Sequence, residues 1–149
     1  MKDILILYYS KNDSTKRMAR AISRGVESVT EATAIIRTVK SAHHSESDDL
    51  LVTKDDLRSC SGMIIGSPTH FGNMAAPLKE FFDNTTDEWF NCTLENKLGG
   101  VFTSTSSMHG GQETTLLSMM LPLLHHGMLI AGVPYSEKAL SSTKSGGTP

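Results

Sequence analysis

Five short apolar runs, each continuous rather than alternating with polar residues, are the feature that most narrows the choice of fold. They lie at Ile4–Tyr9, Ala34–Val39, Met63–Gly66, Gly100–Thr103 and Met128–Val133. Continuous apolar runs of this length are typical of strands that are buried on both faces of a parallel sheet. The sequence therefore predicts five parallel strands, joined by segments long enough to form crossover connections.

The segments between these runs carry apolar residues at helical spacing. The positions are Met18, Ile22, Val26 and Val29 after the first run, Leu78, Phe81 and Phe82 after the third, and Leu116, Leu117, Met120, Leu123 and Leu124 after the fourth. A weak capping-box pattern, Thr53 with Asp56, predicts another short helix. Strands that alternate with helices indicate an α/β, doubly wound sheet. No helical pattern follows the fifth run, so we expect a partly bare sheet face, a longer molecule or a covering partner.

Length, charge and cysteine content limit the function. The 149 residues fit a single domain, residues 1–149. The formal net charge of −2 gives no electrostatic footprint for nucleic acid or an anionic membrane. No apolar run is long enough for a signal-peptide core or a membrane span, and Cys60 and Cys92 form no C-x-x-C pattern. We therefore expect a cytoplasmic protein without structural zinc, whose partner is a small molecule or another copy.

Loops rich in small and hydroxylated residues follow three of the predicted strands, at Ser10–Thr15, Ser67–Met74 and Ser104–Gly111. A doubly wound sheet binds ligands beyond the carboxyl ends of its strands, where these loops lie. The first loop enters a helix N-terminus, where N–H groups and hydroxyls favour a phosphate; plain N-capping is the alternative. The absence of G-x-G-x-x-G, P-loop and G-x-S-x-G motifs argues against a Rossmann dinucleotide site, a P-loop NTPase and an α/β-hydrolase.

Four motifs in order along the chain carry a family resemblance. They read YYSKNDSTKRMA at Tyr8–Ala19, GSPTHFGNM at Gly66–Met74, FTSTSSMHGGQETT at Phe102–Thr115 and LLHHGM at Leu123–Met128. Together they resemble the WrbA flavoproteins, flavodoxin-like NAD(P)H:quinone oxidoreductases that are also called tryptophan repressor-binding proteins. The similarity runs from Lys2 to Pro149, with a shorter segment around residues 40–52.

This resemblance implies an FMN enzyme that moves two electrons from NAD(P)H to a quinone, in a homo-oligomer that is a dimer or a tetramer. The implied flavin contacts are Ser10, Lys11, Asn12, Asp13, Ser14 and Thr15 at the phosphate, Pro68, Thr69, His70, Phe71, Gly72, Asn73 and Met74 at one side of the ring system, and Ser104, Thr105, Ser106, Ser107, Met108, His109 and Gly110 at the other. It also implies that His125 contacts the flavin, that Asn12 contacts the dinucleotide, and that Trp89 lines the quinone pocket from a neighbouring subunit. No catalytic side chain is expected, because the cofactor carries the chemistry. No metal is expected either, because the six histidines have no carboxylate at ligand spacing.

The chain departs from the family pattern at several positions. Asp13 and Ser14 stand where relatives often have Gly and a residue such as His or Ala. A carboxylate beside a phosphate dianion is unfavourable unless it points away. His70 replaces an Arg that many members carry, which bears on dinucleotide affinity. The chain also ends inside the family's GGTPYG motif, so the last helix of the family fold is expected to be missing.

Two other functions stay open at this point. One is a one-electron flavodoxin shuttle, but such proteins tend to be strongly acidic with aromatic flavin loops, whereas this chain is nearly neutral and has Gly, Ser and His there. The other is a flavin-free interaction module, suggested by Asp13 and the missing helix. Apart from the resemblance, His125 and His126 are typical of a helix C-terminus, and Trp89 with Phe90 of core or interface aromatics.

Overall fold

The computed structural model of the chain describes residues 1–41 and 49–142, and it confirms the predicted parallel sheet. The strands are β1 (Lys2–Tyr8), β2 (Ala32–Thr38), β3 (Gly62–Pro68), β4 (Leu98–Ser104) and β5 (Leu129–Ile130). Their order is β2-β1-β3-β4-β5, and every neighbouring pair is parallel. The order reverses between β1 and β3. This switch point brings the loops after β1 and β3 side by side, which is where doubly wound sheets bind ligands.

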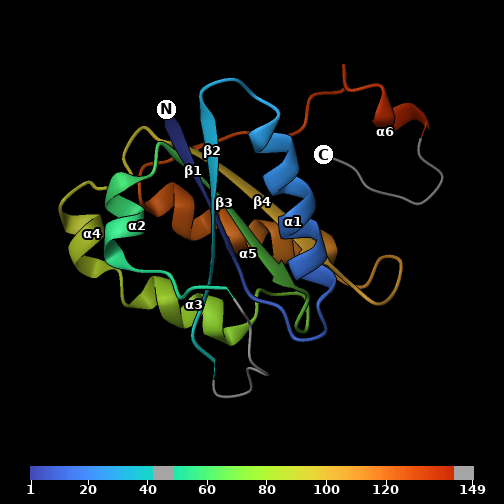
Figure 1. Cartoon of the computed structure of the whole chain (residues 1–149). Helices are drawn as coiled ribbons and strands as arrows, with labels where there is room; N and C mark the ends of the chain where they lie inside the picture. Colours follow the sequence, from blue (N-terminus) through green and yellow to red (C-terminus); the bar gives the residue numbers. More distant parts are fainter. Residues whose placement is uncertain (42–48, 143–149) are drawn as a thin grey trace.

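Helices cover both faces of the sheet, as a doubly wound fold requires (Figure 1). They are α1 (Ser14–Glu27), α2 (Lys54–Ser59), α3 (Ala76–Asp83), α4 (Thr86–Phe90), α5 (Gln112–His125) and α6 (Ala139–Ser142). The predicted capping box is confirmed, since the Thr53 side chain accepts from the Asp56 N–H and the Asp56 side chain accepts from the Thr53 N–H. The short helix α4 has no counterpart in the sequence predictions.

Alternate residues of β1 face two separate apolar cores. Leu5 and Leu7 cluster with buried side chains of α2, α3 and α5, whereas Ile6 and Tyr8 pack with Phe102 and with Ala19 of α1. All four strand residues are almost completely inaccessible, and burying each apolar side chain contributes about 1.5–3 kcal/mol. Burial on both faces explains why the strands have continuous apolar sequences.

The first helix is shorter than predicted, because its apolar stripe does not extend to Val29. α1 ends at Glu27, and Ser28 caps it with N–H bonds to the carbonyls of Arg24 and Gly25. Val29 therefore lies outside the helix and is largely exposed. The reason is a turn that returns the chain to β2, in which Glu31 takes a φ of 67°.

The fifth strand is much shorter than the predicted Met128–Val133. Only Leu129 and Ile130 pair fully with β4, although the Ala131 N–H still bonds to the Gly99 carbonyl. The proline at position 134 lacks an N–H and restricts the residue before it, so the strand cannot continue through it. Pro134 therefore limits how far this edge strand can extend, and regular pairing already ends at Ile130.

A partly bare face is present on the α1 side of the sheet. Leu98 and Leu129 are paired in register there and are 58% and 55% exposed. The expectation of no helix after the fifth strand was wrong in detail, because α6 follows it. However, α6 has only four residues and buries none of them.

Gly66 in the middle of β3 is required by close packing in the smaller core. A Cβ at this position would come within 2.1 Å of the Phe102 ring.

We expect Gly66→Ala to lower the free energy of unfolding by about 1–3 kcal/mol, because Phe102 must leave its place. Gly25→Ala in α1 is the matched control: its Cβ would meet nothing within 4 Å, and we expect a gain of about 0.5–1 kcal/mol from helix propensity. Urea denaturation of both variants measures the difference, and equal effects would contradict this packing.

Candidate flavin site

Three strand-end loops meet at the switch point, and Ser104 joins them. The Ser104 hydroxyl, at the end of β4, lies 3.1 Å from Ser14 Oγ and 3.0 Å from Thr15 Oγ1 at the start of α1. The Ser104 carbonyl accepts a 2.9 Å hydrogen bond from the Thr69 N–H after β3. The loops after β1, β3 and β4 therefore share one edge of the sheet, as the sequence predicted.

Glycine allows the loops after β3 and β4 to approach each other closely. A Cβ at Gly111 would lie 2.9 Å from the Cα of Gly72, and both glycines have positive φ. Beside them, the buried Thr115 places its hydroxyl 3.2 Å from Thr69 Oγ1. The backbones thus form one continuous polar wall.

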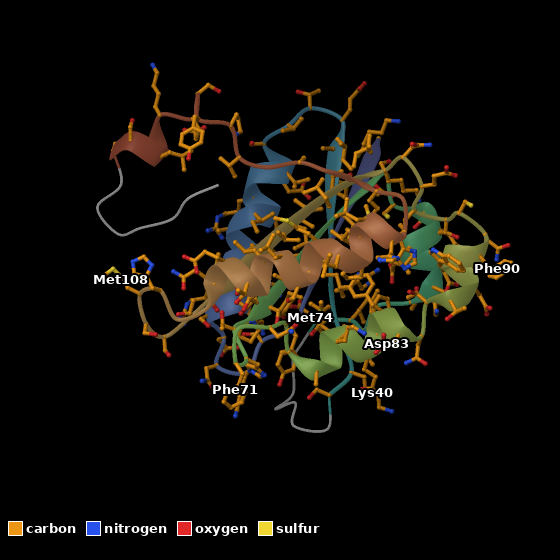
Figure 2. The ribbon with its side chains drawn as sticks, turned by 180° about the vertical axis from the view of Figure 1, so that it is seen from behind. Lys40, Phe71, Met74, Asp83, Phe90 and Met108 are labelled. Carbon is orange, nitrogen blue, oxygen red and sulfur yellow. The ribbon has the colours of Figure 1, made fainter. Side chains whose placement is uncertain are left out.

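A tight turn holds Phe71 in solvent at the tip of the β3 loop. His70 and Asn73 exchange two backbone hydrogen bonds of 2.9 and 3.1 Å. The two central residues, Phe71 and Gly72, have φ values of 53° and 76°, which is the pattern of a type I′ turn. The Phe71 ring is fully exposed and points away from the body of the protein (Figure 2), while the His70 ring contacts Tyr9 edge-on.

The start of α1 can accept an anion. Asp13 precedes the helix with a φ of 59°, and its side chain caps none of the helix N–H groups. The first N–H groups of a helix have no intrahelical acceptor, so they remain available to a ligand. Within residues 1–41 and 49–142, the buried Ser10 Oγ at the start of this loop also has no hydrogen-bond partner. Free donors at a positive helix end fit a phosphate group.

Gln112, which is not among the predicted flavin contacts, belongs to the same edge. It is the first residue of α5, directly after Gly111, and its buried Oε1 has no partner among the described residues. Such an acceptor needs an N–H or O–H donor. The signal in the sequence was its place next to a glycine pair.

The loop after β4 extends outward from this edge. Met108 and His109 are highly exposed, and His109 has a φ of 54°. Figure 2 shows Met108 at the outer end of the loop. A turn in which the Ser107 N–H donates to Thr105 Oγ1 supports the loop at its base.

A separate cavity of about 500 Å³ lies between α3, α4 and α5. Its lining includes Asn73 and Met74 at the β3 loop, and Trp89 and His125 on the helices. The Trp89 indole N–H donates to the His125 carbonyl at 2.9 Å, and the indole is half exposed. The structure therefore brings Trp89 and His125 together.

The structure does not bring Trp89 and His125 close to the loop after β1 or to the loop after β4. His125 is the last residue of α5, whereas the loop after β4 joins the first. These ends are separated by about 20 Å, given a rise of about 1.5 Å per residue. A direct contact of His125 with a flavin held by all three loops of the same chain is therefore not supported.

The comparisons with known proteins agree with this geometry. The model of the NADPH-dependent FMN reductase family matches residues 3–139. The chain belongs to this family. Two curated relatives are named NAD(P)H dehydrogenase (quinone). The relative from Chromohalobacter salexigens is 41% identical, and the match covers 100% of this chain and 81% of the relative. The relative from Syntrophobacter fumaroxidans is 38% identical, and the match covers 98% of this chain and 79% of the relative.

Solved structures confirm the flavodoxin-like fold of this FMN reductase family member. A WrbA-like flavodoxin from Agrobacterium tumefaciens has a TM-score of 0.71 and 27% identity, covering 87% of this chain and 76% of that one. A flavodoxin from the domain Archaea has a TM-score of 0.67 and 22% identity, covering 87% and 78%. No described helix is long and apolar enough to span a membrane, and the described part holds no metal-binding group of three His, Cys, Asp or Glu residues.

A buried glutamate that is paired with two basic residues of α2 helps to position α4 in this fold. Glu88 is almost fully buried, and it accepts from Lys54 Nζ at 2.5 Å and from Arg58 Nη2 at 3.0 Å, both on α2. The hydrogen bond from Lys54 holds the pKa of Glu88 below its usual range, against the effect of burial. The pair ties α4 to α2, so that Trp89, next in the chain, faces the cavity. Trp89 and Phe90 are exposed and are therefore not part of the core.

His126, the second histidine of the pair, is buried and has a defined tautomer. Thr85 Oγ1 donates its one proton to the Phe82 carbonyl at 2.6 Å. His126 Nε2 lies 2.9 Å from Thr85 Oγ1. Nε2 must therefore carry the hydrogen, which leaves Nδ1 as an acceptor without a partner among the described residues. Burial lowers the pKa of His126, so the ring is neutral at neutral pH.

The His126 environment predicts a loss of stability in mild acid. The unfolded chain takes up a proton on this histidine below about pH 6.5, whereas the folded chain does so only at lower pH. We therefore expect the free energy of unfolding to fall between about pH 7 and about pH 5, by at most about 1.4 kcal/mol per pH unit. Chemical denaturation at each pH measures this slope.

His126→Gln provides the comparison, because its amide can still donate to Thr85 and does not titrate. We expect a flatter slope in this variant over the same range. The lowered pKa values of Glu88 and Asp56 reduce stability mainly below about pH 5, at and beyond the acid end of this window. An unchanged slope in the Gln variant would assign the acid sensitivity to other groups.

Proposed function

We propose that the chain is an FMN-dependent oxidoreductase that transfers two electrons from NAD(P)H to quinones, of the WrbA type. The observation that carries this proposal is the meeting of three loops at the switch point of the sheet, with free donors at one end and a backbone wall at the other. The family match and the relatives named NAD(P)H dehydrogenase (quinone) support it.

The residues at the switch point fit FMN. The N–H groups at the start of α1 and the unpartnered Ser10 hydroxyl would hold the phosphate, with Ser14 and Thr15 close by. The flavin, when bound, supplies the hydride and electron chemistry. Gln112 Oε1 would accept from the N–H of the ring system. The other predicted contacts in Ser10–Thr15, Pro68–Met74 and Ser104–Gly110 remain part of this proposal.

The loops position the reactants rather than react with them. The Gly72–Gly111 approach gives a wall of backbone without side chains, against which a flat ring can lie. The turn that carries Phe71 borders the open side, where a nicotinamide would enter, with Asn12 as its proposed contact. Backbone N–H groups of this wall would act as fixed dipoles toward negative charge on a bound ring.

We further propose that Trp89 and His125 serve the flavin of a neighbouring copy. They lie together at the end of α5 away from the loop after β4, so a second molecule is needed to bring them to such a site. Leu117, Leu121 and Leu124 on α5 are each more than half exposed. They repeat at spacings of four and three, and residues 114–124 carry no charge. An uncharged apolar stripe can meet its own copy across a two-fold axis without repulsion.

This arrangement predicts a homo-oligomer, a dimer or a tetramer, that depends on α5. We expect Leu121→Asp to shift the protein to monomers, because it places a charge in the centre of the stripe. Val29→Asp, which charges a similarly exposed apolar residue in the turn before β2, should leave the assembly unchanged. Size-exclusion chromatography with light scattering measures the mass. A wild-type monomer, or a Leu121→Asp variant that still assembles, would contradict the interface.

A single flavodoxin-like domain in the cytoplasm is also part of the proposal. Cys60 is buried and Cys92 is exposed, and both are free thiols. Free cysteines agree with a reducing compartment.

The function is tested by titrating the purified chain with FMN, followed by NADH or NADPH and then a quinone. We expect saturable quenching of flavin fluorescence, bleaching of the flavin band by the nicotinamide, and its return on addition of quinone.

Ser14→Glu should weaken FMN binding at least about tenfold, because it adds an anion where the phosphate is proposed to bind. Ser28→Glu, with the same charge change at the other end of α1, should bind FMN normally.

Two results would overturn the proposal. Failure of the wild-type chain to bind FMN would remove the cofactor and favour an interaction module. Equal FMN affinity in the Ser14 and Ser28 variants would place the phosphate elsewhere.

A further inference from the structure

We propose that Asp13 sets the flavin specificity of the chain, by reducing its preference for FMN over the unphosphorylated flavin, riboflavin. This inference rests on the proposed function, because it assumes that the loops after β1, β3 and β4 hold a flavin. It concerns a different property of that site, namely which flavins it retains.

Asp13 occupies the end of α1 that the phosphate must approach. Its carbonyl accepts a hydrogen bond from the Arg17 N–H at 2.9 Å, so Asp13 is the N-cap residue of α1. Its side chain is exposed and bonds to none of the helix N–H groups. The carboxylate and a bound phosphate therefore share one helix terminus, and the carboxylate leaves the N–H donors free.

Nearby cations do not cancel this carboxylate through a fixed contact. Lys11 lies in the loop, and Lys16 and Arg17 lie in the first turn of α1. None of the ion pairs in the described part of the chain involves these residues or Asp13. The Asp13 carboxylate would therefore repel a phosphate dianion bound at the same helix terminus. Riboflavin has the same ring and no phosphate, so it does not experience this repulsion.

The backbone at Asp13 separates the effect of charge from that of strain. Its φ of 59° lies in the left-handed region, which Asn and Gly also adopt readily. Asp13→Asn removes the charge and keeps a side chain of the same shape. Asp13→Gly also removes the side chain, which relaxes the loop for either flavin.

The test compares dissociation constants of FMN and riboflavin, measured by fluorescence quenching at low ionic strength. We expect Asp13→Asn to tighten FMN binding about 5- to 30-fold, the range expected for loss of close charge repulsion, and to leave riboflavin affinity unchanged. The gain should shrink in about 1 M salt, where the screening length is about 3 Å. Asp87→Asn, which neutralises an exposed acid at the start of α4, is the control and should change neither constant.

The outcomes separate this inference from the function on which it depends. Tighter FMN binding that is matched by riboflavin would assign the effect to strain and overturn the role of charge. Unchanged FMN affinity in both Asp13 variants would also overturn it, while wild-type binding of FMN leaves the proposed function intact. If neither flavin binds to any variant, the proposed function itself fails.

Discussion

The site depends on Ser104, whose two polar groups fix the loops after β1 and β3 against the end of β4. Its hydroxyl reaches Ser14 and Thr15 at the start of α1, and its carbonyl receives the Thr69 N–H. Each such hydrogen bond contributes only about 0.5–1.5 kcal/mol net. Their value here is geometric, because they hold the helix terminus and the glycine wall at a fixed separation before any ligand arrives. Preorganisation of this kind lowers the entropic cost of binding.

The sheet topology explains why the predicted site residues lie in two separate places. Helices that follow parallel strands run back toward the opposite edge, so the two ends of α5 lie at different edges. The first end carries Gly111 and Gln112, and the last carries His125 beside Trp89. One chain can therefore supply the three loops, but its own Trp89 and His125 do not reach a ligand held by them. In the proposed oligomer, the uncharged leucine stripe on the same helix would be the surface through which a second copy completes the site.

Local patterns in the sequence predicted the features that depend on local physics. The strands followed from continuous apolar runs, the start of α2 followed from Thr53 and Asp56, and the site edge followed from the loop composition. Features that depend on distant residues were not predicted. Glu88 is buried because Lys54 and Arg58, at least 30 residues earlier, neutralise it, and His126 is buried because Thr85, 41 residues away, accepts its N–H. No spacing rule contains such pairs.

Asp13 shows how stability of the empty protein and affinity for a ligand can oppose each other at one residue. A negative charge near the N-terminus of a helix stabilises it by about 0.3–1 kcal/mol. In the absence of ligand, Asp13 supplies that charge to α1 without occupying its N–H groups. A phosphate that binds there, as proposed, would supply more charge and direct hydrogen bonds, so the carboxylate would become unfavourable on binding. Under the proposal, the same residue favours the folded, empty loop and weakens its affinity for an anion.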